Sequence, residues 1–200
     1  KLIHREKDMI DFIPDAMAGV AEKRGKVFRG HAKFVGPNSI DVDGTLLEAD
    51  NIVIATGSKP RALPIPGAEL MITSDKILSE RERPDAVIFI GGGVIAMEFS
   101  HVYARAGTDV TILEAVPQLL PRLDVDAVAA IQGETDRIGV NVKTRVRVIE
   151  IRKDGGQLTV EFEHDGATHT VSADRVVNGA GRVANVDTLD LDAGNVNHDG

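Results

Sequence analysis

The sequence predicts an α/β protein whose central part is a parallel sheet with crossover helices. Short apolar runs at 86–90, 109–113 and 140–143 have the length and composition of buried strands. Helical patterns separate these runs, and Gly107 and Gly139 are the residues at which the two helices should end. Strands that alternate with helices in this way are typical of a parallel sheet with right-handed connections.

The residues before this unit predict a helix and a small antiparallel sheet. Apolar residues recur at steps of three and four within 1–24, which predicts a helix that ends at Gly25. The period then changes to two, which predicts a strand over 27–35 and a hairpin over 40–48. The run Asn-Ile-Val-Ile-Ala at 51–55 predicts a further strand, buried on both faces.

A connecting segment should follow, because prolines and a glycine interrupt residues 59–72. A short helix is expected at 73–79, and the polar stretch 80–84 marks a domain boundary. Beyond it, the two crossover helices are expected at 94–106 and at 124–138, the second with Asp124 as its N-cap.

The remainder of the chain predicts a β-meander. Residues 145–152 and 157–164 form two arms around a glycine-rich turn, and the second arm alternates apolar with polar residues. A third strand at 168–171 and a last apolar strand at 175–178 complete the pattern.

Composition argues against several function classes. The 23 basic and 31 acidic residues give a net charge of −8, which disfavours a nucleic-acid or anionic membrane surface. The sequence has no cysteine, so it holds no disulfide, thiol nucleophile or cysteine-ligated metal. The six histidines lack metal-ligand spacing, and we expect no metal site. Without an apolar span or a signal pattern, we expect a cytoplasmic protein.

A Gly-x-Gly-x-x-Ala motif stands where the first parallel strand meets its helix. The first glycine permits a tight turn, the second lets a pyrophosphate approach the backbone, and the alanine allows close packing of helix and strand. The N-terminus of the helix offers unpaired N–H groups to phosphates. The motif therefore predicts a dinucleotide-binding turn formed by Gly91, Gly92, Gly93, Val94, Ile95 and Ala96.

Glu114 ends the next strand, roughly 20 residues after Gly91, where a carboxylate can hold a ribose 2′-hydroxyl. A carboxylate would repel the 2′-phosphate of NADP, and the next cation in the chain is Arg122. This position favours NAD. Ala96 instead favours NADP, because alanine at the third motif position is frequent in NADP enzymes. NADP therefore stays possible.

Three further motifs, in this order and spacing, resemble those of the FAD-dependent pyridine nucleotide–disulfide oxidoreductases. They are Ile54–Pro60 around Ala-Thr-Gly, Val94–Glu98 after the glycines, and Gly179–Asn185 around Gly-Arg. The family includes glutathione reductase, dihydrolipoamide dehydrogenase and mercuric reductase. The resemblance covers nearly the whole chain, which begins at a lysine without methionine and corresponds to the middle of a longer protein.

The resemblance implies a division into three segments. Residues 1–82 match part of the FAD-binding domain, residues 83–180 match a Rossmann-like NAD(P)-binding domain with its β-meander, and residues 181–200 return to the FAD domain. It also implies site residues on both sides of these boundaries. Those expected at the flavin are Ala55, Thr56, Gly57, Gly181 and Arg182.

Glu98 matches the acidic residue that lies near flavin and nicotinamide in the family, and it is the candidate catalytic residue. Two positions depart from the family pattern. Val94 stands where relatives often carry an aromatic that covers the nicotinamide, and Ala184 replaces the proline of the Gly-Arg turn. The first FAD motif, the redox cysteine pair and the dimerisation domain of the family are absent from this sequence.

The resemblance implies a parent enzyme that passes hydride from NADH, in preference to NADPH, to FAD and on to a disulfide or other acceptor. The parent would be a homodimer, and this piece alone would be inactive. Two alternatives stay open. One is a non-catalytic dinucleotide-binding module, and the other is an NADH-dependent flavin oxidase or quinone-type reductase without the cysteine pair.

Overall fold

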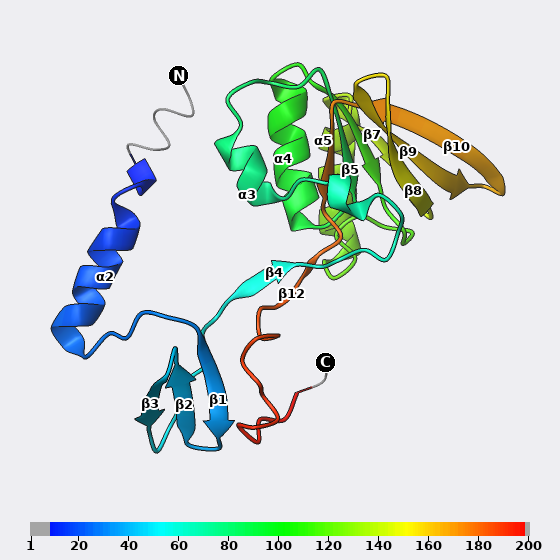
Figure 1. Cartoon of the computed structure of the whole chain (residues 1–200). Helices are drawn as coiled ribbons and strands as arrows, with labels where there is room; N and C mark the ends of the chain where they lie inside the picture. The colour runs from blue at the N-terminus through cyan, green and yellow to red at the C-terminus, as the bar shows by residue number, and fades with distance from the viewer. Residues whose placement is uncertain (1–8, 199–200) are drawn as a thin grey trace. The chain divides into compact units, whose positions relative to one another are not determined.

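The computed structural model describes residues 9–198 and separates them into two compact units (Figure 1). The larger unit comprises residues 60–183, and the smaller unit comprises the described residues before 60 and after 183. The units thus divide at 59/60 and 183/184, whereas the motifs suggested 82/83 and 180/181. The first eight residues of the expected N-terminal helix lie outside the described residues.

The larger unit contains a four-stranded parallel sheet of order β11-β5-β6-β7, which confirms the predicted α/β class. β11 was expected to close the meander. It instead pairs in parallel with β5, because its apolar residues are buried on both faces and suit a covered sheet. The strands are β5 (Ala86–Ile90), β6 (Asp109–Leu113), β7 (Asn141–Lys143) and β11 (Arg175–Asn178).

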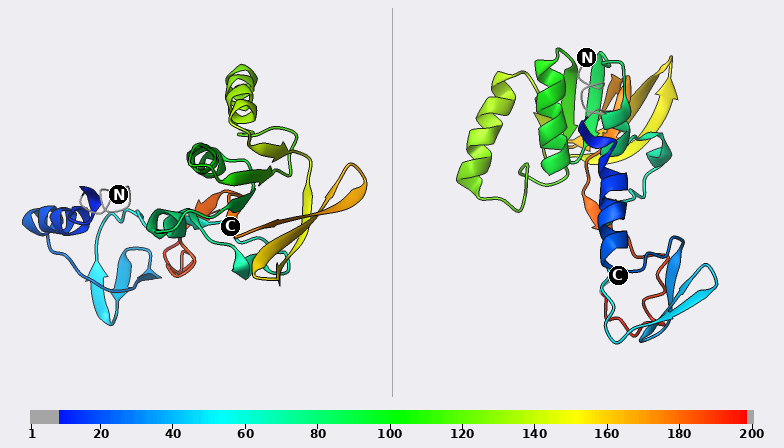
Figure 2. Two further views of the ribbon diagram at one scale, coloured as in Figure 1. Left: turned by 90° about the horizontal axis from the view of Figure 1, so that it is seen from above. Right: turned by 90° about the vertical axis from the view of Figure 1, so that its left-hand side faces the viewer.

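Helices cover one face of this sheet. The crossover helices α4 (Val94–Arg105) and α5 (Val125–Arg137) run side by side (Figure 2). The carboxylate of Asp124 accepts hydrogen bonds from the backbone of Asp126 and Ala127, which confirms it as the N-cap of α5. The core under the helices includes Phe89, Met97 and Ile112 together with Ile77 of the short helix α3 (Ser74–Ser79).

An antiparallel sheet of order β10-β9-β8 covers the other face. Its strands confirm the predicted hairpin and the strand that follows it. Alternate residues of β9, among them Val160 and Phe162, pack against Ile88 and Ile90 of the parallel sheet. The strands are β8 (Arg147–Asp154), β9 (Gln157–His164) and β10 (Ala167–Ala173).

The smaller unit holds a helix and a three-stranded antiparallel sheet of order β1-β2-β3. The hairpin of β2 and β3 forms as predicted, whereas the first strand begins at Ala32 rather than at residue 27. Phe34, Leu189 and Leu191 form its core. The elements are α2 (Ile13–Arg24), β1 (Ala32–Gly36), β2 (Ser39–Val42) and β3 (Thr45–Glu48).

The strand expected at 51–55, buried on both faces, does not form, and this prediction was wrong. The side chain of Val53 is 87% exposed, and Ala55 is exposed as well. An apolar run becomes a strand only when a neighbouring backbone accepts and donates its ladder hydrogen bonds. Within the described residues no strand pairs with this segment.

The proline-rich segment is mostly loop, as predicted, but it contains two short elements. β4 (Ser58–Pro60) pairs with β12 (Arg182–Ala184), and η1 (Ala68–Leu70) is a single 3₁₀ turn. Leu63, Ile65 and Leu70 pack onto the core between the two sheets of the larger unit. No helix among residues 9–198 has the length and apolarity needed to cross a membrane.

Candidate functional site

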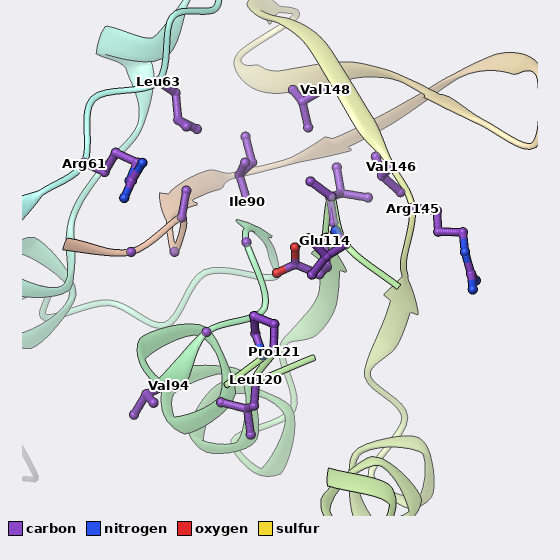
Figure 3. A pocket seen from close by; sticks show the side chains of 18 of the residues that line it. Arg61, Leu63, Ile90, Val94, Glu114, Leu120, Pro121, Arg145, Val146 and Val148 are labelled. Atoms are coloured by element: carbon purple, nitrogen blue, oxygen red, sulfur yellow. Dashed lines mark hydrogen bonds between the residues drawn. The ribbon is translucent and has the colours of Figure 1, made fainter. Parts of the chain in front are cut away.

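A cavity of about 790 Å³ opens in the larger unit at the carboxyl ends of β5 and β6 (Figure 3). Ile90 and Leu113, the last residues of these strands, both line it. Ligands of open parallel sheets bind at this end of the strands, in the crevice between the strand-to-helix turns. Topology therefore places the cavity where a nucleotide site is expected.

The glycine turn forms one wall of the cavity. Gly91 has φ +97°, and a Cβ there would lie 2.5 Å from the carbonyl oxygen of Gly179, so only glycine fits. Gly93 is the N-cap of α4 and carries no side chain that could cap the helix. Gly93 and Val94 line the cavity, so the N–H groups of the first helical turn are available to an anion there.

Ala96 lies behind this wall and is fully buried. A Cβ added to Gly179 would come within 3.1 Å of the Ala96 Cβ, so both small residues are needed for α4 to approach the end of β11. This is the close packing that the third motif position predicts. Gly92 is also buried, and Ile95 is half-buried on α4 without lining the cavity.

The carboxylate of Glu114 links, by hydrogen bonds, the turns that follow β5 and β6. Its side chain is 8% exposed, and it lines the cavity at the end of β6. The Gly92 N–H donates to Oε2 at 2.5 Å, and the Val116 N–H donates to Oε1 at 2.9 Å. A carboxylate oxygen has two lone pairs, so each oxygen keeps one acceptor position for a ligand.

The structure thus brings together residues that are far apart in the sequence. Six of the residues predicted for cofactor binding line this one cavity. They are Gly91, Gly93, Val94, Glu114, Gly181 and Arg182. Residues 181 and 182 were expected at the flavin boundary, and they lie here beside the glycine turn.

Glu98 is not part of this set. It is exposed on α4 and does not line the cavity. Two other polar residues of the same helix contact α5. His101 Nε2 lies 2.9 Å from Thr135 Oγ1, and Arg105 donates a hydrogen bond to Glu134 at 2.7 Å. Burial and the nearby Arg105 charge lower the pKa of His101.

Ala55, Thr56 and Gly57 belong to the smaller unit, where all three are exposed. Asn185 contacts them, with its backbone N–H donating to the Gly57 carbonyl at 3.0 Å. Ala55 and Thr56 line a cavity of about 100 Å³. Ligand pockets for cofactors measure roughly 300–1,000 Å³, so the described residues of this unit do not by themselves enclose a flavin.

Sequence reasoning missed most of the cations at the site. Five arginines line the larger cavity, and Glu114 is its one acidic residue among the described residues. The arginines are Arg61, Arg122, Arg145, Arg147 and Arg182. In a chain of net charge −8, this concentration of positive charge suits a ligand that carries phosphates. The part of the chain that the structure describes holds no cluster of His, Asp and Glu that could bind a metal.

Comparison with known proteins agrees with this geometry. The family model described as pyridine nucleotide-disulphide oxidoreductase matches residues 12–200. A dihydrolipoyl dehydrogenase of Mycobacterium tuberculosis is 34% identical over 184 residues, which cover 87% of this chain and 39% of the relative. One from Cupriavidus necator is 32% identical over 201 residues, which cover 96% of this chain and 42% of the relative.

Among solved structures, the HOCl-induced flavoprotein disulfide reductase RclA from Escherichia coli superposes with a TM-score of 0.85 at 27% identity. The match covers 96% of this chain and 44% of that protein. The chain therefore spans about two fifths of the length of these three proteins. By the family match and by its motifs, this chain belongs to the pyridine nucleotide-disulphide oxidoreductase family.

Proposed function

We propose that the larger unit binds NADH and that the parent protein passes its hydride to FAD and on to a disulfide or another acceptor. One observation supports this most: the glycine turn and the Glu114 carboxylate line the same cavity at the carboxyl ends of β5 and β6. The turn and the start of α4 offer N–H groups to a pyrophosphate, and the carboxylate offers acceptors to a ribose.

The two free acceptor positions of Glu114 match the two donors of a ribose 2′,3′-diol. Its other two positions are used by the N–H groups of Gly92 and Val116, which hold the carboxylate in place. A 2′-phosphate replaces the 2′-hydroxyl donor by a group that is largely dianionic at neutral pH, and it would place like charges in contact. NADH is therefore the proposed cofactor, with NADPH as the weaker ligand.

The remaining roles follow the family resemblance. Hydride transfer between nicotinamide and flavin is chemistry that the two cofactors supply, and the protein orients them. Glu98, on the exposed face of α4, would orient the nicotinamide end. Residues 55–57 would contact FAD together with parts of the parent protein. The parent would act as a homodimer, and this chain alone would bind NADH without turnover.

The experiment is a calorimetric titration of the 200-residue chain with NADH and, separately, with NADPH. Glu114→Gln keeps the size of the side chain but replaces one acceptor oxygen, and we expect NADH affinity to fall about ten-fold. Glu114→Arg should reverse the preference toward NADPH. Glu69→Gln, which removes an exposed carboxylate on η1, is the matched control. Tighter binding of NADPH than of NADH by the unmodified chain would refute the proposed cofactor choice.

A further inference from the structure

The five arginines of the cavity differ in what their guanidinium groups contact. Arg147 donates to Glu163, with its Nε 3.0 Å from the carboxylate, so its charge is compensated. Arg61 and Arg145 have no acidic partner among residues 9–198. They lie on opposite sides of Glu114 in Figure 3, where the Arg145 side chain points away from that carboxylate and Arg61 points toward the middle of the cavity.

The backbone of Arg61 is held against the loop that follows β11. Its N–H donates to the Gly181 carbonyl at 3.0 Å. Its own carbonyl accepts from Asn178 Nδ2 at 2.8 Å, and Asn178 Oδ1 accepts from the Ala180 N–H at 3.1 Å. The side-chain amide of Asn178 thus links the Arg61 backbone to Ala180, two residues after Asn178 in the chain.

The same loop touches the glycine turn. A Cβ on Gly91 would lie 2.5 Å from Gly179 O and 2.7 Å from Ala180 Cα, so these backbones are in direct contact. Arg61 is consequently fixed relative to the start of α4, although the two are about 30 residues apart in the chain. Leu63 and Ile65 line the cavity beside it.

From this geometry we infer that Arg61 is an anion-binding residue of the nucleotide site, that its guanidinium pairs with the diphosphate of a dinucleotide, and that Asn178 positions it. This inference rests on the proposed NADH site and adds a side-chain cation to it. A planar guanidinium can form two parallel hydrogen bonds to phosphate oxygens and carries a full positive charge, which the N–H groups of the glycine turn do not. The inferred ligand class is a nucleoside diphosphate.

The test measures binding of NADH, ADP-ribose and adenosine to the 200-residue chain, using fluorescence for NADH and ligand-observed NMR for the other two. Arg61→Gln should weaken NADH and ADP-ribose about ten-fold and leave adenosine within two-fold, because adenosine lacks the diphosphate. Arg61→Lys should recover part of the loss. Arg81→Gln removes the same charge from an exposed position of the larger unit outside the cavity, and it should change none of the three affinities by more than two-fold.

Asn178→Ala separates positioning from direct contact. It should weaken ADP-ribose less than Arg61→Gln does, and it should have no further effect when combined with Arg61→Gln. Equal losses in Arg61→Gln and Arg81→Gln, or a ten-fold loss of adenosine binding in Arg61→Gln, would overturn the role of Arg61 while leaving the NADH site intact. Failure of the unmodified chain to bind NADH would overturn the proposed function and this inference together. Circular dichroism of each variant identifies any that is unfolded, and Arg61→Lys then carries the test.

Discussion

The two units bury their apolar residues to very different degrees. In the larger unit, β5 and β6 are covered on both faces, and Val87, Phe89 and Ile112 are almost completely inaccessible. In the smaller unit, α2 has no buried residue at all. Phe12, next to its N-terminus, is 63% exposed, and Met17 on the helix is equally so.

This difference shows what apolar periodicity can and cannot predict. The three- and four-residue steps in α2 predict a helix with one apolar face, and the helix forms. The pattern does not say which surface covers that face. Among the described residues nothing buries it, whereas α4, which is more strongly amphipathic, buries Ala96, Met97 and Tyr103 against the sheet. We therefore expect matched substitutions to have unequal effects in the two units.

Phe89→Ala should have the largest effect. Phe89 is a fully buried residue of β5 on the helix-covered face of the sheet, so its truncation should lower the free energy of unfolding of the larger unit by about 3–5 kcal/mol. Phe12→Ala removes the same ring from an exposed position and should change stability by about 0.5 kcal/mol or less. Tyr103, the single tyrosine of the chain, lies 6.3 Å from the Phe89 ring and reports urea unfolding of this unit by fluorescence, and circular dichroism of the whole chain follows both units. Equal shifts of the urea midpoint in the two variants would contradict the comparison.

Gly91→Ala and Gly57→Ala form the next pair, because both glycines have positive φ, +97° and +72°. A Cβ at Gly57 meets no atom within 4 Å, so alanine there should cost only backbone strain, about 1 kcal/mol. At Gly91 the Cβ also collides with the Gly179 carbonyl, and we expect a loss of about 3 kcal/mol. NADH binding, measured by calorimetry, should be abolished by Gly91→Ala and unchanged by Gly57→Ala. Unchanged NADH binding in Gly91→Ala would count against the proposed site.

Sequence alone located the parts of the site that depend on short-range constraints. The turn from Gly91 to Ala96 and the carboxylate of Glu114 follow strands whose apolar runs are unambiguous, and both line the cavity or support its wall. Arg61 could not be found in this way. It reaches the cavity from a proline-rich loop, through a hydrogen bond to Asn178 that no spacing rule predicts.

The sequence also failed to predict which strands pair, because pairing likewise depends on residues that are distant in the chain. Residues 51–55 and 175–178 are both short apolar runs in the sequence. The second joins the parallel sheet beside β5, whereas the first has no paired strand among the described residues. A strand is defined by a partner that lies elsewhere in the chain, so a local pattern predicts its composition more reliably than its place in a sheet.

Glu134→Gln should have the smallest effect and a defined pH dependence. Its hydrogen bond from Arg137 at 2.6 Å, aided by Arg105, lowers the pKa of Glu134 from 4.5 to about 2. Because the folded-state pKa is the lower one, this pair stabilises the larger unit above about pH 4.5, and the contribution is lost as the pH falls toward 2. The stability difference between the unmodified chain and Glu134→Gln, measured by Tyr103 fluorescence in urea, should therefore shrink over this range. Added salt should also reduce this stability difference, since the Arg137–Glu134 ion pair is exposed.

Glu22→Gln, which removes the partner of Arg29 in the smaller unit, should leave the Tyr103 transition unchanged at every pH. A Glu134→Gln difference that is constant from pH 7 to pH 2 would show that the link between α4 and α5 does not depend on this carboxylate's charge.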